Sequence, residues 1–158
     1  MSQIAPEQPV AEFALPATDG KTVGRSDLLG SWTVLYFYPK DSTPGCTQEG
    51  QDFRDLYPKF QEIGAKVYGV SRDSVRSHDN FRCKQQFPFD LLSDPDETLC
   101  NLFDVIKLKN MYGKQVRGIE RSTFILDPAG RIAREWRKVS VKGHAAEVLE
   151  ALQKFQAN

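Results

Sequence analysis

Apolar and β-branched residues follow one another without a polar break over residues 33–38, where the chain reads TVLYFY. An unbroken apolar run of this length is typical of a central strand that is buried on both faces. Pro39 has no amide hydrogen to donate to a neighbouring strand, so the predicted strand ends there.

A helical pattern begins a few residues later. Apolar side chains recur at intervals of three and four residues, at Phe53, Leu56, Phe60 and Ile63. This spacing places them on one face of an amphipathic helix that begins near Cys46 and stops at Gly64. A strand, a short loop and a long helix are the first half of a βαβ unit.

The rest of the chain alternates between short strands and helices. After an extended arm and a short strand in the first twenty residues, the pattern predicts strands over 66–71 and 91–93, helices over 75–87 and 96–103, a β-hairpin over 122–126 and 131–136, and a closing helix over 144–155. Residues 104–120 have no clear period. This order predicts one α/β domain over residues 1–158, with a thioredoxin-like fold in which helices flank a central mixed sheet and a β extension precedes it.

The charged side chains balance. The 158 residues contain 21 Lys and Arg and 21 Asp and Glu, so the formal net charge is zero, which disfavours nucleic acid and anionic membranes as partners. The N-terminus lacks the basic start and apolar core of a signal peptide, and no run reaches the roughly 18 apolar residues of a membrane-spanning helix. We therefore expect a soluble, cytoplasmic protein.

Three widely spaced cysteines are an odd number and do not form a disulfide framework. A reducing cytosol keeps structural disulfides open, so cysteine chemistry in this chain is expected to be transient or catalytic. The alternative for each cysteine is a small apolar side chain in the core.

The turn KDSTPGCT, residues 40–47, places Cys46 where the loop becomes the long helix. Only the thiolate is a strong nucleophile, and free cysteine, with a pKa of about 8.5, is mostly protonated at neutral pH. A helix N-terminus stabilises an anion by on the order of 1 kcal/mol, so strong activation needs a cation from elsewhere in the chain. Thr43 stands at the first position of a C-x-x-C spacing, and its hydroxyl disfavours disulfide exchange of the usual kind.

Pro39, Thr43 and Cys46 form the pattern P-x-x-x-T-x-x-C, and the stretch YFYPKDSTPGCTQE resembles the peroxidatic loop of the peroxiredoxins, most closely that of the bacterioferritin comigratory protein or peroxiredoxin Q group. The likeness covers most of the chain, through SDLLGSWTVLYFYPK, GVSRDSVRSHDNF, FDVIKLKNMYGKQVRGIERSTFILD and GHAAEVLEAL. Arg121, in ERSTFILD, falls where that family has its active-site arginine.

The resemblance implies a thiol peroxidase without a cofactor, acting on hydrogen peroxide and organic hydroperoxides. The Cys46 thiolate would attack one peroxide oxygen, and Arg121 with nearby backbone N–H groups would stabilise the developing charge. Thr43 would orient the peroxide, and Pro39 would shelter the sulfur from water. The same resemblance implies a monomer that is reduced by thioredoxin.

The cysteine that resolves the sulfenic acid of Cys46 is less clearly marked. Many members of the group have it five residues after the reactive cysteine, where this chain has Gln51. Others have it in the next helix, directly after a phenylalanine, and here Cys83 comes one residue later than that position, which rotates the side chain by about 100° on a helix. Cys83 is nevertheless the candidate, because Cys100 lies between apolar residues and is expected to be a packing residue.

Two alternatives stay open at this point. If neither cysteine reaches Cys46, the protein is a one-cysteine peroxidase that depends on an external thiol such as glutathione with glutaredoxin. The other alternative is a protein of the same fold without enzymatic activity, in which oxidation of Cys46 by peroxide switches a partner interaction.

The remaining signals predict no further site. His78 and His144 are far from each other in sequence and from any pair of cysteines, so we expect no metal site and interpret both as surface or capping residues. A local basic stretch is interpreted as a solvated loop, with docking of an acidic reductase as the alternative; it contains Lys107, Lys109, Lys114 and Arg117.

Overall fold

A five-stranded sheet forms the centre of the molecule. The structure is a computed structural model that describes residues 8–157. The strands lie in the order β5-β4-β3-β8-β9, and their bounds in that order are Asp90–Ser93, Lys66–Ser71, Thr33–Phe37, Ser122–Leu126 and Ile132–Trp136. Strands β3, β4 and β5 are parallel to one another, whereas β8 is antiparallel to both β3 and β9, so the sheet is mixed as expected.

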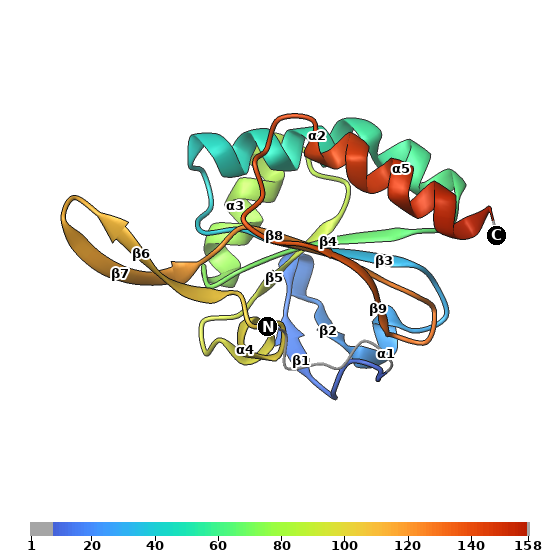
Figure 1. Ribbon diagram of the computed structural model, residues 1–158, viewed down its shortest axis with the longest axis horizontal. Helices are drawn as coiled ribbons and strands as arrows, with labels where there is room; N and C mark the ends of the chain where they lie inside the picture. The colour runs from blue at the N-terminus through green and yellow to red at the C-terminus, as the bar shows by residue number, and fades with distance from the viewer. Residues whose placement is uncertain (1–7, 158) are drawn as a thin grey trace.

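Helices cover both faces of this sheet. Their bounds are α1 Arg25–Leu28, α2 Pro44–Glu62, α3 Val75–Gln85, α4 Thr98–Leu102 and α5 His144–Gln156. Figure 1 shows α2 and α5 on one side of the sheet, and α4 with a hairpin of β1 (Ala14–Pro16) and β2 (Thr22–Gly24) on the other. The thioredoxin-like α/β prediction is confirmed, although the start of the expected N-terminal arm, residues 1–7, lies outside the described range. Within that range no helix is both long enough and apolar enough to cross a bilayer.

Alternate residues of β3 bury against opposite layers. Val34 and Tyr36 belong to the core beneath α2 and α5, whereas Leu35 and Phe37 belong to the core on the side of α4 and the β1–β2 hairpin. All four side chains are at most 1% exposed. Because successive side chains of a strand point to opposite faces, a strand with a layer on each side needs an apolar residue at every position. This requirement explains the unbroken apolar run.

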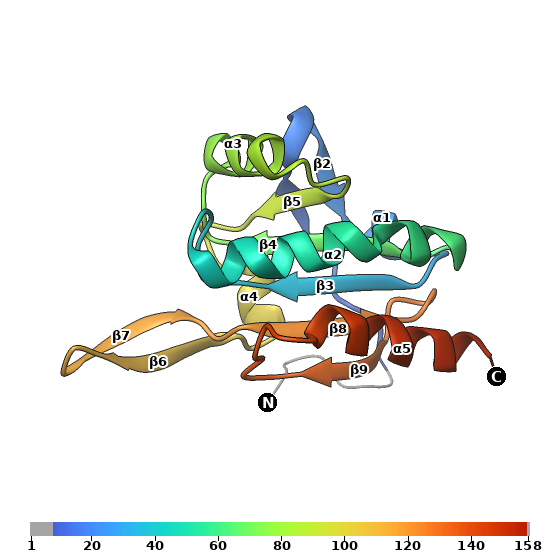
Figure 2. The ribbon, with the colours of Figure 1, turned by 90° about the horizontal axis from the view of Figure 1, so that it is seen from above.

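The segment without a sequence period is a second hairpin. Strands β6 (Ile106–Met111) and β7 (Lys114–Ile119) pair antiparallel, and Tyr112 and Gly113 between them both have positive φ, as a two-residue type I′ turn requires. The lack of a clear period in residues 104–120 therefore did not mark an irregular segment. Figures 1 and 2 show that this hairpin projects from the body of the protein, which explains why neither of its faces shows the apolar period of a buried strand.

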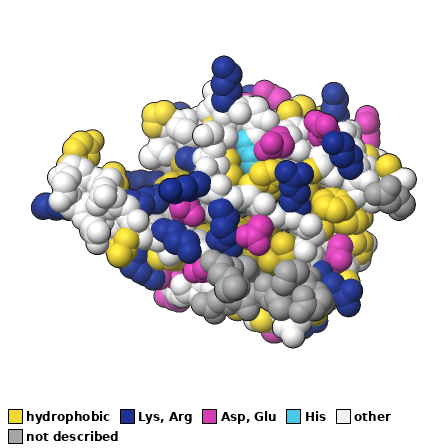
Figure 3. All heavy atoms as spheres, viewed as in Figure 1, with side chains coloured by type: hydrophobic (Ala, Val, Ile, Leu, Met, Phe, Trp, Pro, Cys, Tyr) yellow, Lys and Arg dark blue, Asp and Glu magenta, His cyan; other side chains and the backbone are white. Residues whose placement is uncertain are grey.

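The hairpin surface combines apolar and basic side chains, as the space-filling view shows (Figure 3). Its exposed large apolar residues are Leu108, Met111, Tyr112 and Val116. The basic stretch is not the solvated loop that we expected. Arg117 forms an ion pair with Glu97 at 2.5 Å, and Lys107 forms one with Asp104 at 3.2 Å, so part of its charge is neutralised within the chain.

Helix α2 lies very close to the end of α3. A Cβ atom placed on Gly50 would lie 2.3 Å from Cζ of Phe87, a distance that real structures do not tolerate. The ring of Phe87 cannot easily move away, because it stacks on Phe89 at 5.2 Å and meets Phe81 edge-on at 5.0 Å. Gly50 therefore sets the distance between the helix that begins at Cys46 and the helix that contains Cys83.

We expect Gly50→Ala to destabilise the protein. An alanine normally stabilises a helix interior by about 1 kcal/mol relative to glycine, but overpacking against Phe87 should cost up to about 3 kcal/mol, leaving a net loss of up to about 2 kcal/mol. Urea denaturation measures this loss, with Lys59→Ala at an exposed position of the same helix as the control, expected within about 0.5 kcal/mol of wild type. An increase in stability for Gly50→Ala would contradict the tight packing.

Candidate active site

Cys46 lies in the first turn of α2. Thr43 is the N-cap residue in extended conformation, and Pro44 occupies the first helical position, where a missing N–H costs nothing. The first bond of the helical ladder runs from the amide of Thr47 to the carbonyl of Thr43 at 2.8 Å. The amides of Gly45 and Cys46 precede it and belong to the positive end of the helix dipole. The Cys46 side chain is 2% exposed.

Arg121 supplies the cation that the sequence requires. It comes directly before β8, whose first residue, Ser122, pairs with Phe37 at the end of β3. This register brings Arg121 to the turn after β3, where its Nη2 donates a hydrogen bond to Sγ of Cys46 at 3.4 Å. Gly45 leaves room for it, since a Cβ atom there would lie 3.2 Å from Nη2. Sequence reasoning placed Cys46 and Arg121 in one site, and the structure brings them together.

Glu49 is a site residue that sequence reasoning missed. Its Oε1 accepts a hydrogen bond from Nη1 of Arg121 at 2.6 Å, and its side chain is only 1% exposed. The second oxygen, Oε2, is buried without a hydrogen-bond partner among the described residues. Glu49 follows Cys46 by three residues, so both face the same side of α2, and a carboxylate at this spacing is the signal that could have identified it.

Burial dominates the ionisation of the Glu49 carboxyl. It raises the pKa of Glu49 from 4.5 to about 7, although the charge of Arg121 and its hydrogen bond act in the opposite direction. For Arg121, burial lowers the pKa, but Glu49 and Cys46 together raise it above its ordinary value. The guanidinium therefore stays charged, while the carboxyl beside it titrates close to neutral pH.

Thr43 and Pro39 lie on the turn that leads to Cys46. The hydroxyl of Thr43 donates to the carbonyl oxygen of Lys40 at 2.8 Å. A carbonyl oxygen cannot donate, so the hydroxyl hydrogen is committed and the hydroxyl oxygen can accept a further hydrogen bond. Pro39 is half-buried at the end of β3. Both residues thus lie on the turn between the strand and Cys46, as the sequence indicates.

The other two cysteines differ sharply in their surroundings. Cys83 is exposed on α3, whereas Cys100 lies within α4 and is completely buried in the core, and all three cysteines are free thiols. Burial raises the pKa of Cys100, and Asp94 raises it further. Such a thiol is inert, in agreement with the expectation that Cys100 is a packing residue.

Gln51 connects α2 to the end of α3. Its Nε2 donates to Oε1 of Gln85 at 2.9 Å, two residues beyond Cys83. Arg54, on the next turn of α2, donates to the carbonyl of Gln85 at 2.9 Å. The position five residues after Cys46 is therefore occupied by a residue that ties the two helices together.

Neither histidine lies at the surface, contrary to the expectation of surface or capping residues. His78 is completely buried and His144 is 4% exposed. His144 Nε2 lies 2.8 Å from the hydroxyl of Thr123, and the ring packs edge-on against Trp136. Polar partners inside the fold make their burial possible, and these partners are distant in the sequence.

A surface depression of about 440 Å³ lies beside Arg121. It lies between the base of the β6–β7 hairpin and the segment after β9. Its lining combines basic and apolar side chains and consists of Leu108, Lys109, Asn110, Glu120, Arg121, Lys138 and Val139. Arg121 therefore lines this hollow, whereas Cys46 and Thr43 do not.

Comparisons with known proteins agree with this geometry. The family model described as AhpC/TSA family matches residues 6–135. The chain is 59% identical over 154 residues to Peroxiredoxin Bcp of Xanthomonas campestris, with 96% of each chain covered. A structure of the bacterioferritin comigratory protein of Xanthomonas campestris, from work on its alkyl peroxide reduction activity, gives a TM-score of 0.87 at 59% identity over 90% of this chain and 91% of that one. A mutant of Xylella fastidiosa PrxQ gives 0.93 at 48% identity over 99% of each chain.

The raised pKa of Glu49 predicts a pH-dependent loss of stability. Below pH 4.5 the carboxyl is protonated in both the folded and the unfolded chain. As the pH rises from 4.5 to about 7 the unfolded carboxyl ionises while the buried one keeps its proton. The wild type should therefore lose about 3 kcal/mol over this range relative to Glu49→Gln.

Urea denaturation at a series of pH values measures this divergence. The exposed Glu62→Gln on the same helix is the control and should follow the wild type at every pH. If Glu49→Gln instead lost stability relative to wild type as the pH rose, the ion pair with Arg121 would outweigh burial and the assignment would be wrong.

Proposed function

Because this chain belongs to the Bcp and PrxQ peroxiredoxins of the AhpC/TSA family, which are thiol peroxidases, we propose that it reduces hydrogen peroxide and organic hydroperoxides through a sulfenic acid at Cys46. The observation on which this rests is the Arg121 guanidinium, 3.4 Å from Sγ at the N-terminus of a long helix. The alkyl peroxide reduction described for the Xanthomonas campestris relative supports the inclusion of organic hydroperoxides.

The first step is the attack of the Cys46 thiolate on the terminal oxygen of the peroxide. The S–O bond forms as the O–O bond breaks, so the sulfur is oxidised to sulfenic acid and the peroxide is reduced. The leaving oxygen departs as hydroxide or alkoxide and takes a proton from solvent. Negative charge shifts from sulfur to the leaving oxygen, and Arg121 with the amides of the first helical turn can stabilise it at both places.

Thr43 acts as a hydrogen-bond acceptor in this step. Its hydroxyl hydrogen points to the carbonyl of Lys40, so its oxygen accepts the hydrogen of the hydroperoxyl group and orients the peroxide for in-line attack. Pro39, half-buried beside the turn, keeps bulk water from the sulfur. Both roles are those that the resemblance implied.

Glu49 positions Arg121 and adjusts its strength. The carboxyl holds Nη1 while Nη2 reaches the sulfur, which fixes the plane of the guanidinium. With a pKa of about 7, the carboxyl is partly protonated at neutral pH. A neutral Glu49 leaves the whole positive charge of Arg121 to the thiolate and the leaving oxygen.

The second step is the attack of the Cys83 thiol on the sulfenic acid, which gives a Cys46–Cys83 disulfide and water. Cys83 is the exposed cysteine, and Cys100 is buried with a raised pKa. Cys46 is itself buried, so the first turn of α2 opens before the two sulfurs reach the separation of a disulfide.

Thioredoxin is the proposed reductant of this disulfide, because a disulfide formed by local unfolding is exposed and readily reduced. The cytoplasm remains the proposed location, because a reducing compartment returns such a disulfide to thiols. We retain the monomer as the working form, on the resemblance alone.

The oxygen of Thr43 should matter for the peroxide step. Thr43→Val keeps the shape but removes the acceptor, so kcat/KM for hydrogen peroxide should fall about a hundredfold. Thr43→Ser keeps the hydroxyl and should stay within about tenfold of wild type. The measurement is NADPH oxidation coupled through thioredoxin reductase and thioredoxin.

The same assay tests the proposed activity as a whole. Steady turnover by the wild type supports a peroxidase recycled by thioredoxin, whereas turnover only with glutathione and glutaredoxin would support the one-cysteine alternative. A single stoichiometric burst with every reductant would support the peroxide-sensing alternative. Equal rates for Thr43→Val and Thr43→Ser would contradict the role of the hydroxyl.

One equivalent of peroxide should form the disulfide within a single chain. The intact mass should fall by two hydrogens in the wild type and in Cys100→Ser. In Cys83→Ser the mass should instead rise by one oxygen, located on Cys46 by peptide mapping. A disulfide that persists in Cys83→Ser and disappears in Cys100→Ser would assign resolution to Cys100 instead.

A further inference from the structure

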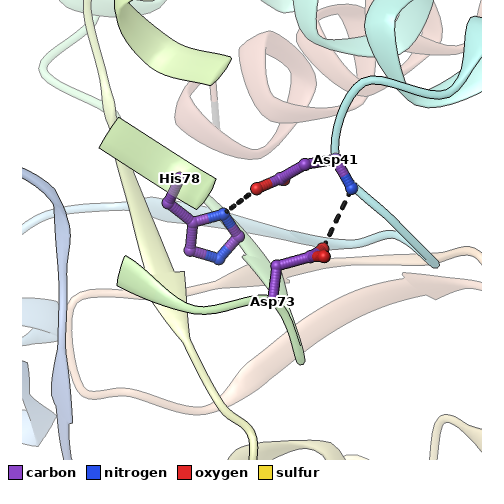
Figure 4. A group of neighbouring side chains, drawn as sticks. All are labelled: Asp41, Asp73 and His78. Carbon is purple, nitrogen blue, oxygen red and sulfur yellow. Dashed lines mark hydrogen bonds and ion pairs between the residues drawn. The ribbon is translucent and has the colours of Figure 1, made fainter. Parts of the chain in front are cut away.

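A buried polar cluster lies behind the reactive turn. Asp41, in the turn that leads to Cys46, faces His78 on α3, with Nδ1 of the ring 2.7 Å from Oδ2 of the carboxylate. Figure 4 shows the ring of His78 and the carboxylate of Asp41 pointing toward each other, with Asp73 beneath them. The exposed fractions of the two paired side chains are 0% and 3%. The pair therefore joins the turn to α3 in the interior of the protein.

Both ring nitrogens of His78 face acceptors. Nε2 lies 2.9 Å from the carbonyl oxygen of Leu92, which can only accept, so Nε2 holds a hydrogen. A single proton then lies between Nδ1 and Asp41, and the pair as a whole is neutral whichever atom holds it. The carboxylate also accepts from Tyr38 at 2.6 Å and from Ser77 at 2.8 Å. Removal of either partner leaves a buried polar group unsatisfied.

The backbone of Asp41 is fastened as well. Its amide donates to Oδ2 of Asp73 at 2.9 Å, and the same oxygen accepts from the hydroxyl of Ser71 at 2.6 Å. Asp41, Asp73 and His78 lie close enough together to hold a metal ion. However, both oxygens of Asp41 and both nitrogens of His78 already have hydrogen-bond partners, so hydrogen bonding alone accounts for the cluster.

The residue after this anchor is in an unfavourable conformation. Ser42 has a φ of 64°, which a residue other than glycine adopts only when its surroundings enforce it. Asp41 fixes one end of this strained link, and Thr43 with α2 fixes the other. The position of the Thr43 hydroxyl and of the Cys46 sulfur therefore depends on the anchor at Asp41.

We propose that Asp41 and His78 are positioning residues that fasten the Cys46 turn to α3, and that their bond favours the peroxide step and opposes the opening needed for the disulfide. The inference rests on the proposed function, because it assigns opposite effects to the two steps of that reaction. With the anchor intact, Thr43 and Cys46 are held where the peroxide meets Arg121. Opening of the first turn of α2 is opposed by the same anchor. The anchor fastens the turn to α3, which is the helix that contains Cys83.

The test follows both steps in one experiment with the full chain. Reduced protein is mixed rapidly with one equivalent of hydrogen peroxide and quenched at intervals, and intact mass separates the added oxygen of the sulfenic acid from the two lost hydrogens of the disulfide. In His78→Leu the first step should slow about tenfold and the second should accelerate about tenfold, the effect of one lost hydrogen bond on each. Ser77→Ala, which removes one donor to Asp41, should also slow the first step and accelerate the second, by smaller factors. It replaces His78→Leu in the test if that variant does not fold.

A matched variant separates positioning from general loss of stability. Ser74→Ala removes the N-cap of α3, where the hydroxyl accepts from the amide of Ser77 at 3.2 Å, and should leave both steps unchanged. If His78→Leu and Ser77→Ala slow both steps, leave both unaltered or match Ser74→Ala, the proposal is wrong.

Amide hydrogen exchange provides a readout that does not need the disulfide. Residues 40–49 should exchange about tenfold faster in His78→Leu than in wild type and Ser74→Ala. If the wild type reacts with peroxide but forms no Cys46–Cys83 disulfide, the proposed resolution fails while the anchor is decided by this exchange rate. Equal exchange in all three proteins would overturn the anchor itself.

Discussion

The rest of the site depends on the hydrogen bonds of the Arg121 guanidinium to Cys46 and Glu49. The guanidinium lies between a sulfur and a carboxylate that are three residues apart on one helix face, 3.4 Å from the first and 2.6 Å from the second. The mixed sheet makes this possible, because the antiparallel pairing of β8 with β3 returns residue 121 to the turn from which the helix starts. If β8 ran parallel to β3, the start of β8 would lie at the other end of the strands, away from the turn after β3.

The site balances two opposing demands on charge. A thiolate needs positive charge around it, and the helix N-terminus alone supplies on the order of 1 kcal/mol. Burying Glu49 beside Arg121 fixes the guanidinium but also offers it a competing anion. Burial of Glu49 also limits this effect, because it raises the pKa of Glu49 to about 7. At neutral pH the carboxyl is then partly protonated and competes less with the thiolate for the charge of Arg121. A more exposed carboxylate would hold Arg121 equally well but would remain an anion.

The sequence indicated those features whose causes are local. The strand at 33–38 and the helix after Cys46 follow from an apolar run and an amphipathic pattern. The pairing of Cys46 with Arg121 is not local and was indicated only by the family resemblance. The β6–β7 hairpin was missed because it projects into solvent, where no apolar period is required. Glu49 and His78 were missed for the opposite reason. A charged residue that is buried looks like any other polar position until its partner, here 72 or 37 residues away, is known.

The contacts between α2 and α3 also restrict how Cys46 could approach a cysteine on α3. In this chain Gln51, Gly50 and Arg54 all bind α2 closely to the end of α3, so the body of α2 cannot move toward Cys83 as a unit. Any approach must therefore come from the first helical turn alone, between the tight contact at Gly50 and the strained link at Ser42. These two limits confine the opening to a few residues, and those residues are the ones that hold Cys46 against Arg121. In the proposed mechanism, reactivity of Cys46 toward peroxide and its access to Cys83 would thus require opposite states of one short segment.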